Sequence, residues 1–352
     1  MSKPAGAGIA PALIRWHATH GRRDLPWQLE RTPYRVWISE IMLQQTQVAV
    51  VIPYYERFMR RFPEVRALAD APLDAVLHLW AGLGYYARAR NLHRAAQRIR
   101  DEHAGLFPAS FAEVAALPGI GRSTAGAILA LSRDAHFPIL DANARRVLSR
   151  FFGIESDGSE LAVTQRLWDL AESSTPHAQV ATYTQAIMDL GATLCVRRRP
   201  LCLACPLSGD CAARRAGRQH EIPAPRRSRA RARRHTYMLA AIRPDGAVRL
   251  EKRPGHGIWG GLWCLPEFQD PQSADSFVER VLGGTACGVS ALGTITHGFT
   301  HFELAITPLL ARCRGEAQVE EGAATLWYHP KTPQSVGLPA PVRALVEQIC
   351  HA

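Results

Sequence analysis

The stretch Leu117-Pro118-Gly119-Ile120-Gly121-Arg122-Ser123-Thr124-Ala125 decides the fold of the first half of this chain. It closes one helical pattern and opens another within a few residues, so it predicts two helices joined by a tight hairpin. Gly119 and Gly121 are expected to supply backbone angles that other residues rarely adopt. The free N–H groups of the turn and of the next helix N-terminus would form an anion site, for which phosphate is the obvious occupant. An ordinary tight corner between two helices is the alternative.

Helical patterns continue on both sides of this turn. Thr32 can cap a helix that begins at Pro33, and Ser110 and Glu113 have the spacing of a capping box. No stretch in the first 211 residues alternates convincingly between apolar and polar side chains, so we expect an all-α domain over residues 1–211. Further helices are predicted near residues 72–82, 86–103, 110–117, 122–133, 142–152, 160–173 and 177–192.

The overall composition is that of a globular protein with an excess of positive charge. At roughly 150 residues per domain, 352 residues correspond to about two domains. Lys and Arg number 42 against 31 Asp and Glu, and the net charge of +11 favours a polyanionic partner; a basic enzyme with no nucleic-acid role is the alternative. The sequence contains neither a run of about 18 apolar residues nor a secretory signal, so we expect no membrane association, a cytoplasmic location and reduced cysteines.

The pattern changes after Cys211. Residues 212–234 are rich in Arg and contain prolines and a single acid, which predicts a linker, either a solvated hinge or a strap that tracks DNA. Apolar runs flank Pro244-Asp245-Gly246, which is a strong hairpin signal. We therefore expect a smaller mixed α and β domain over residues 235–352, and an α+β multidomain chain. Its other elements are predicted as strands at 291–296, 302–310 and 324–328 and as helices at 274–282 and 339–350.

Four cysteines form the most specific motif, Cys195-x6-Cys202-x2-Cys205-x5-Cys211. Four thiolates this close in sequence can enclose one metal centre. A structural zinc site normally uses two closely spaced pairs, and only Cys202 and Cys205 form such a pair. The spacing therefore favours an iron–sulfur cluster, with zinc as the alternative.

Two carboxylates have sequence surroundings that suit acid–base chemistry. Glu40 lies between Trp37 and Leu43 in a mostly apolar helix, where burial would raise the pKa of its carboxyl group. A solvated acid is the alternative for Glu40 taken alone. Asp141 stands 20 residues after Gly121, and by itself it is the expected N-cap of a helix that starts at Ala142.

Together, the hairpin, the aspartate and the cysteine spacing resemble the helix-hairpin-helix DNA glycosylases of the endonuclease III superfamily. The stretches SEIMLQQTQV (residues 39–48) and GLGYYARARN (residues 82–91) resemble the MutY family of adenine glycosylases within it. The resemblance implies an all-α glycosylase domain with a [4Fe-4S] cluster, followed by a Nudix-like domain that reads the mispair. It also implies a monomeric hydrolase of base excision repair, associated with the nucleoid in a bacterium. Its substrate would be adenine opposite 8-oxoguanine or guanine in double-stranded DNA.

The same resemblance implies roles for individual residues. Glu40 would protonate adenine, and Asp141 would stabilise the positive charge that develops at C1′. Gln45 and Tyr85 would occupy the space left by the extruded nucleotide, although core packing is the alternative for Tyr85. Further implied roles are cluster binding by Cys195, Cys202, Cys205 and Cys211, DNA or base contact by Gly119, Gly121, Ser123, Asn143, Trp27, Gln28 and Gln185, and 8-oxoguanine reading by Phe299, Thr300 and His301.

Several positions depart from the pattern of relatives. Ser123 stands where bifunctional glycosylases carry a lysine, and because serine cannot form an imine we expect base removal without strand cleavage. Thr300 replaces the usual serine, and Ala142 replaces a glycine. The acidic helix with which Nudix hydrolases bind Mg²⁺ is missing, so nucleotide hydrolysis is not expected. The rival functions are another mismatch-specific glycosylase of the superfamily and a non-catalytic iron–sulfur protein that binds damaged DNA.

Overall fold

The computed structural model describes residues 8–156, 160–224, 231–282, 286–313 and 322–351, which fall into two compact units. The first unit contains the described residues up to Asp70 and those from Asn91 to residue 224. The second contains residues 71–90 and the described residues from 231 onwards, so a segment from the helical half of the sequence packs with the C-terminal part. None of the described helices is long and apolar enough to cross a membrane.

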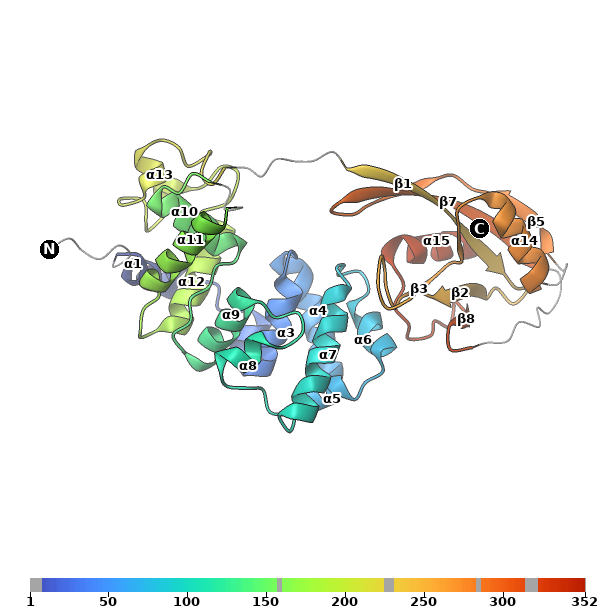
Figure 1. Cartoon of the computed structure of the whole chain (residues 1–352), viewed down its shortest axis with the longest axis horizontal. Helices are drawn as coiled ribbons and strands as arrows, with labels where there is room; N and C mark the ends of the chain where they lie inside the picture. Colours follow the sequence, from blue (N-terminus) through green and yellow to red (C-terminus); the bar gives the residue numbers. More distant parts are fainter. Residues whose placement is uncertain (1–7, 157–159, 225–230, 283–285, 314–321, 352) are drawn as a thin grey trace. The chain divides into compact units, whose positions relative to one another are not determined.

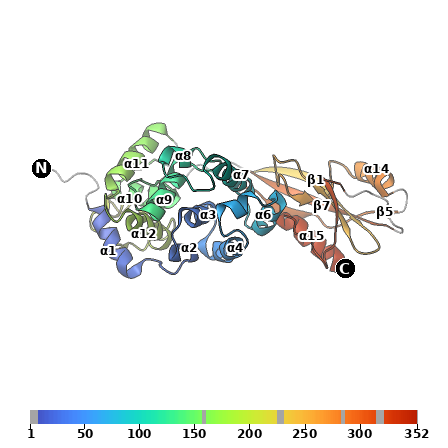
Figure 2. The ribbon, with the colours of Figure 1, turned by 90° about the horizontal axis from the view of Figure 1, so that it is seen from below.

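The first unit is helical throughout the part that the structure describes, as predicted (Figure 1). Its core packs α9, α10 and α12 against α1 and α11, and Figure 2 shows these helices gathered together. Leu148, Leu167 and Leu190 are fully buried there. The elements are α1 (Ile9–His20), α2 (Pro26–Leu29), α3 (Pro33–Leu43), α4 (Val48–Arg61), α5 (Val65–Ala69), α7 (Ala87–Glu102, which begins in the second unit), α8 (Phe111–Ala115), α9 (Arg122–Arg133), α10 (Ala142–Phe152), α11 (Leu161–Ser174), α12 (Val180–Thr193), a short 3-10 helix (Cys202–Ala204) and α13 (Ala212–Arg215).

Local capping signals explain where several of these helices begin. The Thr32 side chain accepts a hydrogen bond from the backbone N–H of Arg35 at 3.3 Å, and Ser110 and Glu113 form the predicted capping box at α8. The helices predicted at residues 122–133 and 142–152 are found with those bounds as α9 and α10. The predicted N-cap, Asp141, accepts a hydrogen bond from the backbone N–H of Ala144 at 2.7 Å.

The hairpin between α8 and α9 depends on one of its two glycines. Gly119 has φ +80°, and a Cβ there would lie 2.8 Å from Cβ of Asn91, so both conformation and space require glycine. The expectation for Gly121 is wrong: it has an extended backbone (φ −94°, ψ 173°) as the N-cap of α9, and a Cβ would meet nothing within 4 Å.

The basic tract 212–234 is more ordered than a linker at both ends. Residues 212–215 form α13, and Ile222 is buried. Arg218 forms ion pairs with Glu221 inside the tract and with Glu155 of the helical unit, which ties this part of the tract to the fold. At the other end, residues 232–234 already belong to a strand. The remaining part of the tract, residues 225–230, lies outside the described residues.

Over the residues that the structure describes, the second unit is built on an eight-stranded sheet whose two long strands, β1 and β7, pair in parallel from end to end. Ala232 pairs with Phe302 at one end of this ladder and Ile242 with Arg312 at the other. The predicted hairpin at residues 244–246 joins β1 to β2, with Gly246 at φ +85°. The strands are β1 (Ala232–Ile242), β2 (Val248–Lys252), β3 (Trp263–Cys264), β4 (Glu267–Phe268), β5 (Ala286–Ala291), β6 (Ile295–Gly298), β7 (Phe302–Cys313) and β8 (Thr325–Tyr328).

The described part of this unit also contains the start of α7 and the helices α6 (Leu73–Trp80), α14 (Pro271–Leu282) and α15 (Ala340–His351). Helix α14 covers the sheet with Ala274 and Val278, which pack against Leu239 and Leu309. Helix α6 is held by an ion pair between Asp74 and Lys252 at 2.8 Å. The strand predicted at 291–296 is wrong, because β5 ends at residue 291 and β6 begins at residue 295, with the chain leaving the ladder between them.

Candidate active site

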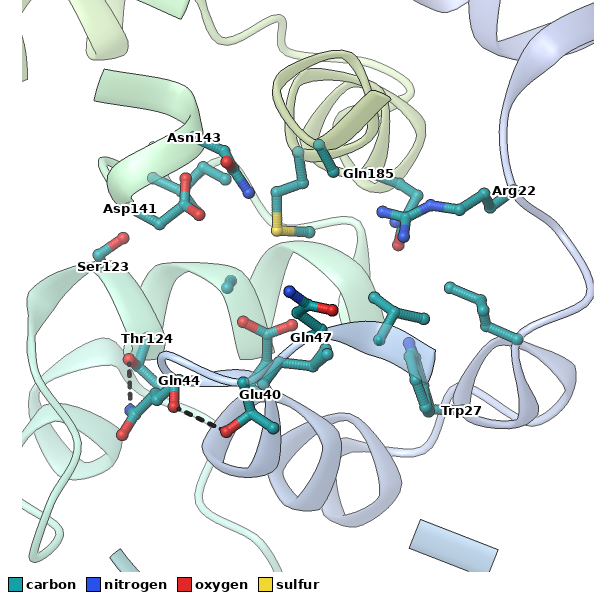
Figure 3. A pocket seen from close by; sticks show the side chains of 18 of the residues that line it. Arg22, Trp27, Glu40, Gln44, Gln47, Ser123, Thr124, Asp141, Asn143 and Gln185 are labelled. Carbon is teal, nitrogen blue, oxygen red and sulfur yellow. Dashed lines mark hydrogen bonds between the residues drawn. The ribbon is translucent and has the colours of Figure 1, made fainter. Parts of the chain in front are cut away.

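A cavity of about 570 Å³ opens in the first unit between α3, the start of α4, α9, the N-terminus of α10 and α12 (Figure 3). Residues far apart in the sequence therefore meet around one space, which is large enough for a nucleobase and part of its sugar. Six of the residues implicated by the sequence line this cavity: Trp27, Glu40, Ser123, Asp141, Asn143 and Gln185. Its other polar lining residues, which the sequence did not single out, are Arg22, Gln44, Thr46, Gln47 and Thr124.

Glu40 is positioned on the inward face of α3, one turn after the fully buried Trp37. It is partly exposed to the cavity, but the protein surrounds most of it. Burial raises the pKa of Glu40 to about 8, and the charge of Asp141 contributes to the same shift. Glu40 can therefore hold a proton at neutral pH and deliver it to a group in the cavity.

Asp141 faces the cavity from the N-terminus of α10. Burial raises the pKa of Asp141 above its usual range, while the backbone N–H groups of Ala144 and Asn143 and the guanidinium of Arg146 oppose that shift. These three interactions favour the charged form, as does the helix N-terminus. The site thus holds two carboxyl groups in different surroundings, an arrangement that can separate a proton donor from an ionised partner.

The position of Asp141 is tied to the hairpin through Ser123. The Ser123 hydroxyl oxygen accepts a hydrogen bond from the backbone N–H of Leu140 at 2.9 Å. Ser123 lies in the first turn of α9, so this contact links the helix after the hairpin to the residue that precedes Asp141. Ser123 lines the cavity but has no amine with which to attack a sugar carbon.

Arg146 connects the Asp141 end of α10 with the segment that carries the cysteines. Its guanidinium donates to Oδ1 of Asn143 at 2.7 Å. It also donates to the backbone oxygens of Gly191 at 2.6 Å and Cys195 at 2.7 Å. The side chain of Asn143, on the cavity wall, is therefore held from the same guanidinium that fixes the start of the cysteine segment.

Arg150, one turn further along α10, is buried and points into the cysteine segment. It donates to the backbone oxygen of Val196 at 2.8 Å and to Sγ of Cys195 at 3.3 Å. The Cys211 thiol in turn lies 3.4 Å from the backbone oxygen of Arg150. A buried guanidinium requires such partners, and here they come almost entirely from the segment it organises.

All four predicted metal-binding cysteines line one small cavity of about 30 Å³. Leu194, Pro200 and Arg214 contribute to its wall, which encloses the thiols on several sides. The donor set is all sulfur, as iron–sulfur clusters require. Among the residues that the structure describes, no three His, Cys, Asp or Glu side chains converge as they would around a single bound ion.

The remaining base-contact candidates of the first unit lie outside the cavity lining. Gln28 is packed away from it, with both side-chain amide atoms buried and without a hydrogen-bond partner among the described residues. Gln45 is exposed between α3 and α4 and has a left-handed backbone with φ 58°. A non-glycine residue such as Gln45 is uncommon at positive φ, and such strain concentrates at functional positions. Gly119 and Gly121 lie in the hairpin, away from the cavity lining.

The second unit holds Tyr85 together with the predicted reading loop. Tyr85 also has a left-handed backbone, with φ 49°, and its side chain is 47% exposed. Its hydroxyl lies 3.3 Å from Oγ1 of Thr300. Phe299 stacks on Phe302 with ring centroids 4.5 Å apart, and His301 is exposed. Tyr85, Phe299, Thr300 and His301 therefore meet on one side of this unit.

Comparison with known proteins defines the class first. Residues 38–173 match the HhH-GPD superfamily of base excision DNA repair proteins, and residues 237–348 match the NUDIX domain. The solved structure of a thermostable thymine-DNA glycosylase has a TM-score of 0.53 and 26% identity, covering 59% of this chain and 95% of that one. Endonuclease III in a non-covalent complex with DNA has a TM-score of 0.51 at 19% identity, which supports the helical fold alone.

Whole-chain relatives define the particular family. The adenine DNA glycosylase of Buchnera aphidicola from Acyrthosiphon pisum is 38% identical over 337 residues, which cover 95% of each chain. The human adenine DNA glycosylase is 33% identical over 354 aligned positions, covering 83% of this chain and 65% of the human protein. This chain belongs to the adenine DNA glycosylase family.

Proposed function

We propose that this protein removes adenine from double-stranded DNA where adenine lies opposite 8-oxoguanine or guanine. The observation that carries the proposal is the presence of Glu40 and Asp141 on one cavity of nucleobase size, in a chain whose relatives are adenine DNA glycosylases. Glycosidic cleavage needs a proton on the departing base and a negative charge near the sugar, and these two carboxyl groups can supply them.

Glu40 donates its proton to N7 of the extruded adenine. The bond between N9 and C1′ breaks with its electron pair leaving on adenine, so the base departs neutral. The carboxylate of Asp141 stabilises the cation at C1′, as an ion pair or a transient covalent bond. Water then adds its oxygen to C1′ and returns a proton to Glu40, leaving an abasic site and a regenerated acid.

The reaction stops at base removal. Strand cleavage by a bifunctional glycosylase requires an amine that forms an imine with C1′. Ser123 occupies the corresponding position, and its hydroxyl oxygen is engaged by Leu140. We therefore assign a monofunctional, hydrolytic activity.

Mispair recognition is divided between the two halves of the sequence. Residues 1–211 carry the chemistry, residues 212–234 connect the halves, and residues 235–352 read 8-oxoguanine with Phe299, Thr300 and His301. Gln45 and Tyr85 occupy the duplex where the nucleotide has been extruded. Their exposure and left-handed backbones support this role, because both side chains are presented outwards by strained turns. The hairpin at Gly119 and Gly121 holds a backbone phosphate.

Cys195, Cys202, Cys205 and Cys211 would hold one [4Fe-4S] cluster. The position of all four cysteines on the wall of one small cavity supports this assignment. When bound, the cluster would cross-link the segment that contains Arg197, Arg198 and Arg199, and so fix these cations for contact with DNA phosphates. The protein acts as a monomer in the compartment that holds the DNA.

The test is release of adenine from defined duplexes under single-turnover conditions. We expect free adenine from 8-oxoguanine:adenine and guanine:adenine duplexes, and no base from thymine or uracil mismatches. Release of thymine or uracil would favour a different mismatch glycosylase. Tight mispair binding with no base release would identify a damage-binding protein without catalysis.

A further inference from the structure

A buried carboxylate that the mechanism does not use lies behind the cavity wall. Asp189, on α12, is 1% exposed, and its surroundings are unusually rich in donors. Oδ1 accepts hydrogen bonds from Nε and Nη2 of Arg22 at 2.9 and 2.6 Å and from Nε2 of Gln185 at 2.9 Å. Oδ2 accepts from the backbone N–H of Arg22 at 2.9 Å and lies 3.5 Å from Nε2 of His17.

These contacts keep Asp189 ionised. Burial opposes its charge, but His17 and the ion pair and hydrogen bonds from Arg22 hold the pKa of Asp189 below its usual value. An ionised carboxylate only accepts hydrogen bonds. Both of its functional partners, Arg22 and Gln185, line the cavity, so Asp189 acts on the cavity through them.

The carboxylate decides which way the Gln185 amide faces. Since Asp189 cannot donate, the NH₂ group of Gln185 must point towards it, and the amide oxygen must point the other way. Gln185 is 5% exposed and sits one helical turn before Asp189 on the same face of α12, so it has little room for another arrangement. The amide oxygen is therefore the atom of Gln185 that is offered to a ligand in the cavity.

We infer that Asp189 is a positioning residue for base specificity, which fixes Gln185 as a hydrogen-bond acceptor for the exocyclic amino group of a 6-aminopurine. A 6-oxopurine presents an acceptor at that position, so two oxygens would face each other and both would lose their hydrogen bonds with water. A site built to hydrogen-bond one group rejects the analogue that cannot pair with it. This inference rests on the proposed adenine glycosylase activity and assigns the choice of base to Gln185 as held by Asp189.

The experiment compares release of adenine and of hypoxanthine, each placed opposite 8-oxoguanine, in single-turnover reactions of the full-length protein. The variants are Asp189→Asn, Gln185→Met and the double substitution. Asparagine keeps the shape of the side chain but has one acceptor oxygen and one NH₂ donor. It therefore no longer forces the Gln185 amide to turn its NH₂ group towards position 189. The matched control is Asp169→Asn, because Gln165 donates to Asp169 at 2.9 Å in the same four-residue spacing on the exposed surface of α11.

We expect the ratio of the adenine rate to the hypoxanthine rate to fall about tenfold in each single variant, with no further fall in the double variant. The Asp169→Asn control should keep the parent ratio. A purely structural defect would lower both rates together and leave the ratio unchanged, and that result would overturn the inference. If Asp189→Asn does not fold, Gln185→Met decides, because an unchanged ratio there would exclude the acceptor role.

The outcomes for the parent protein separate this inference from the proposed function. Equal release of adenine and hypoxanthine by the parent would overturn the specificity role of Asp189 and leave the glycosylase activity intact. No release of adenine at all would overturn both.

Discussion

The Ser123 hydroxyl oxygen and the backbone N–H of Leu140 form a 2.9 Å hydrogen bond between the helix that follows the hairpin and the residue before Asp141. Ser123 stands at the position where bifunctional glycosylases carry a lysine, and here its side chain is hydrogen-bonded to the backbone. This hydrogen bond joins the first turn of α9 to the residue before the N-cap of α10, 17 positions along the chain, and both Ser123 and Asp141 line the cavity.

Ser123→Ala should loosen the position of Asp141, because it removes the hydroxyl group that holds the preceding residue. The buried N–H of Leu140 would lose its acceptor, at a cost of about 1 to 3 kcal/mol in the free energy of unfolding. We expect single-turnover adenine release to slow about tenfold while mispair affinity stays within twofold. Ser132→Ala is the matched control, since Ser132 lies in the last turn of the same helix. A parent-like excision rate in Ser123→Ala would show that this bond does not position Asp141.

Borohydride should trap no covalent complex between the parent protein and its substrate. Trapping requires an imine, and Ser123 offers no amine where bifunctional glycosylases have lysine. The measurement is a denaturing gel of labelled duplex after reaction in the presence of borohydride, with endonuclease III as the positive control. Efficient trapping of the parent would mean that another amine reaches C1′, and the monofunctional assignment would fail.

Glu40→Gln should keep mispair binding and lose at least a hundredfold in the rate of adenine release. The amide preserves the shape of the side chain and removes the proton donor. In the parent, release should slow as the pH rises through about 8, because the acid form of Glu40 is then lost. Glu56→Gln, on the exposed face of α4, serves as the control. A rate for Glu40→Gln within tenfold of the parent rate would contradict the role of Glu40 as acid.

The same substitution should stabilise the fold at neutral pH. In the unfolded chain Glu40 loses its proton near pH 4.5, whereas in the folded protein its pKa is about 8. Between these values unfolding releases a proton, so this group makes the free energy of unfolding fall as the pH rises. Glu40→Gln removes that penalty, and we expect a gain of about 1 to 3 kcal/mol at pH 7. Denaturant unfolding at pH 5 and pH 8 should show the gap between variant and parent widening with pH; a constant gap would argue against the raised pKa.

Cys202→Ser should weaken DNA binding more than it slows excision by saturating protein. Losing one cluster ligand would release the segment with Arg197, Arg198 and Arg199, so fewer counterions would be displaced from the DNA and the salt dependence of binding would flatten by roughly one unit per lost phosphate contact. Iron content and visible absorbance should fall in this variant. Cys264→Ser, in the buried core of the second unit, should leave both unchanged. An unchanged salt dependence with a collapsed excision rate would place the cluster in the chemistry.

Features that depend on neighbouring residues could be predicted from the sequence. The bounds of α9 and α10 follow from caps and helix-ending residues within a few positions, and the hairpin at residues 244–246 follows from its turn residues. Glu40 and Asp141 each have a local signature, an apolar helix in one case and a cap in the other. These signatures leave a solvated acid and a simple helix cap as alternatives, and the resemblance to the glycosylase family singles both residues out.

Features that depend on tertiary contacts could not be predicted from the sequence. Arg22 and Asp189 meet across 167 positions, and neither carries a motif, so the polar network behind the cavity is invisible in the sequence. The left-handed backbones of Gln45 and Tyr85 are equally hidden, because both residue types ordinarily avoid that conformation. Nothing local predicts that residues 71–90 pack with the C-terminal sheet, since the ion pair of Asp74 with Lys252 spans 178 positions.

Asp141 caps α10 and is also the proposed partner of the C1′ cation, and this combination limits how the reaction can proceed. Its carboxylate is pinned by backbone N–H groups at the start of α10, so it cannot swing to follow a sugar that arrives off centre. In the proposed reaction, the Asp141 carboxylate is therefore already oriented when charge begins to develop at C1′. On this proposal the DNA has to move to the carboxylate, and a nucleotide that is only partly withdrawn from the double helix would leave its C1′ out of reach of Asp141.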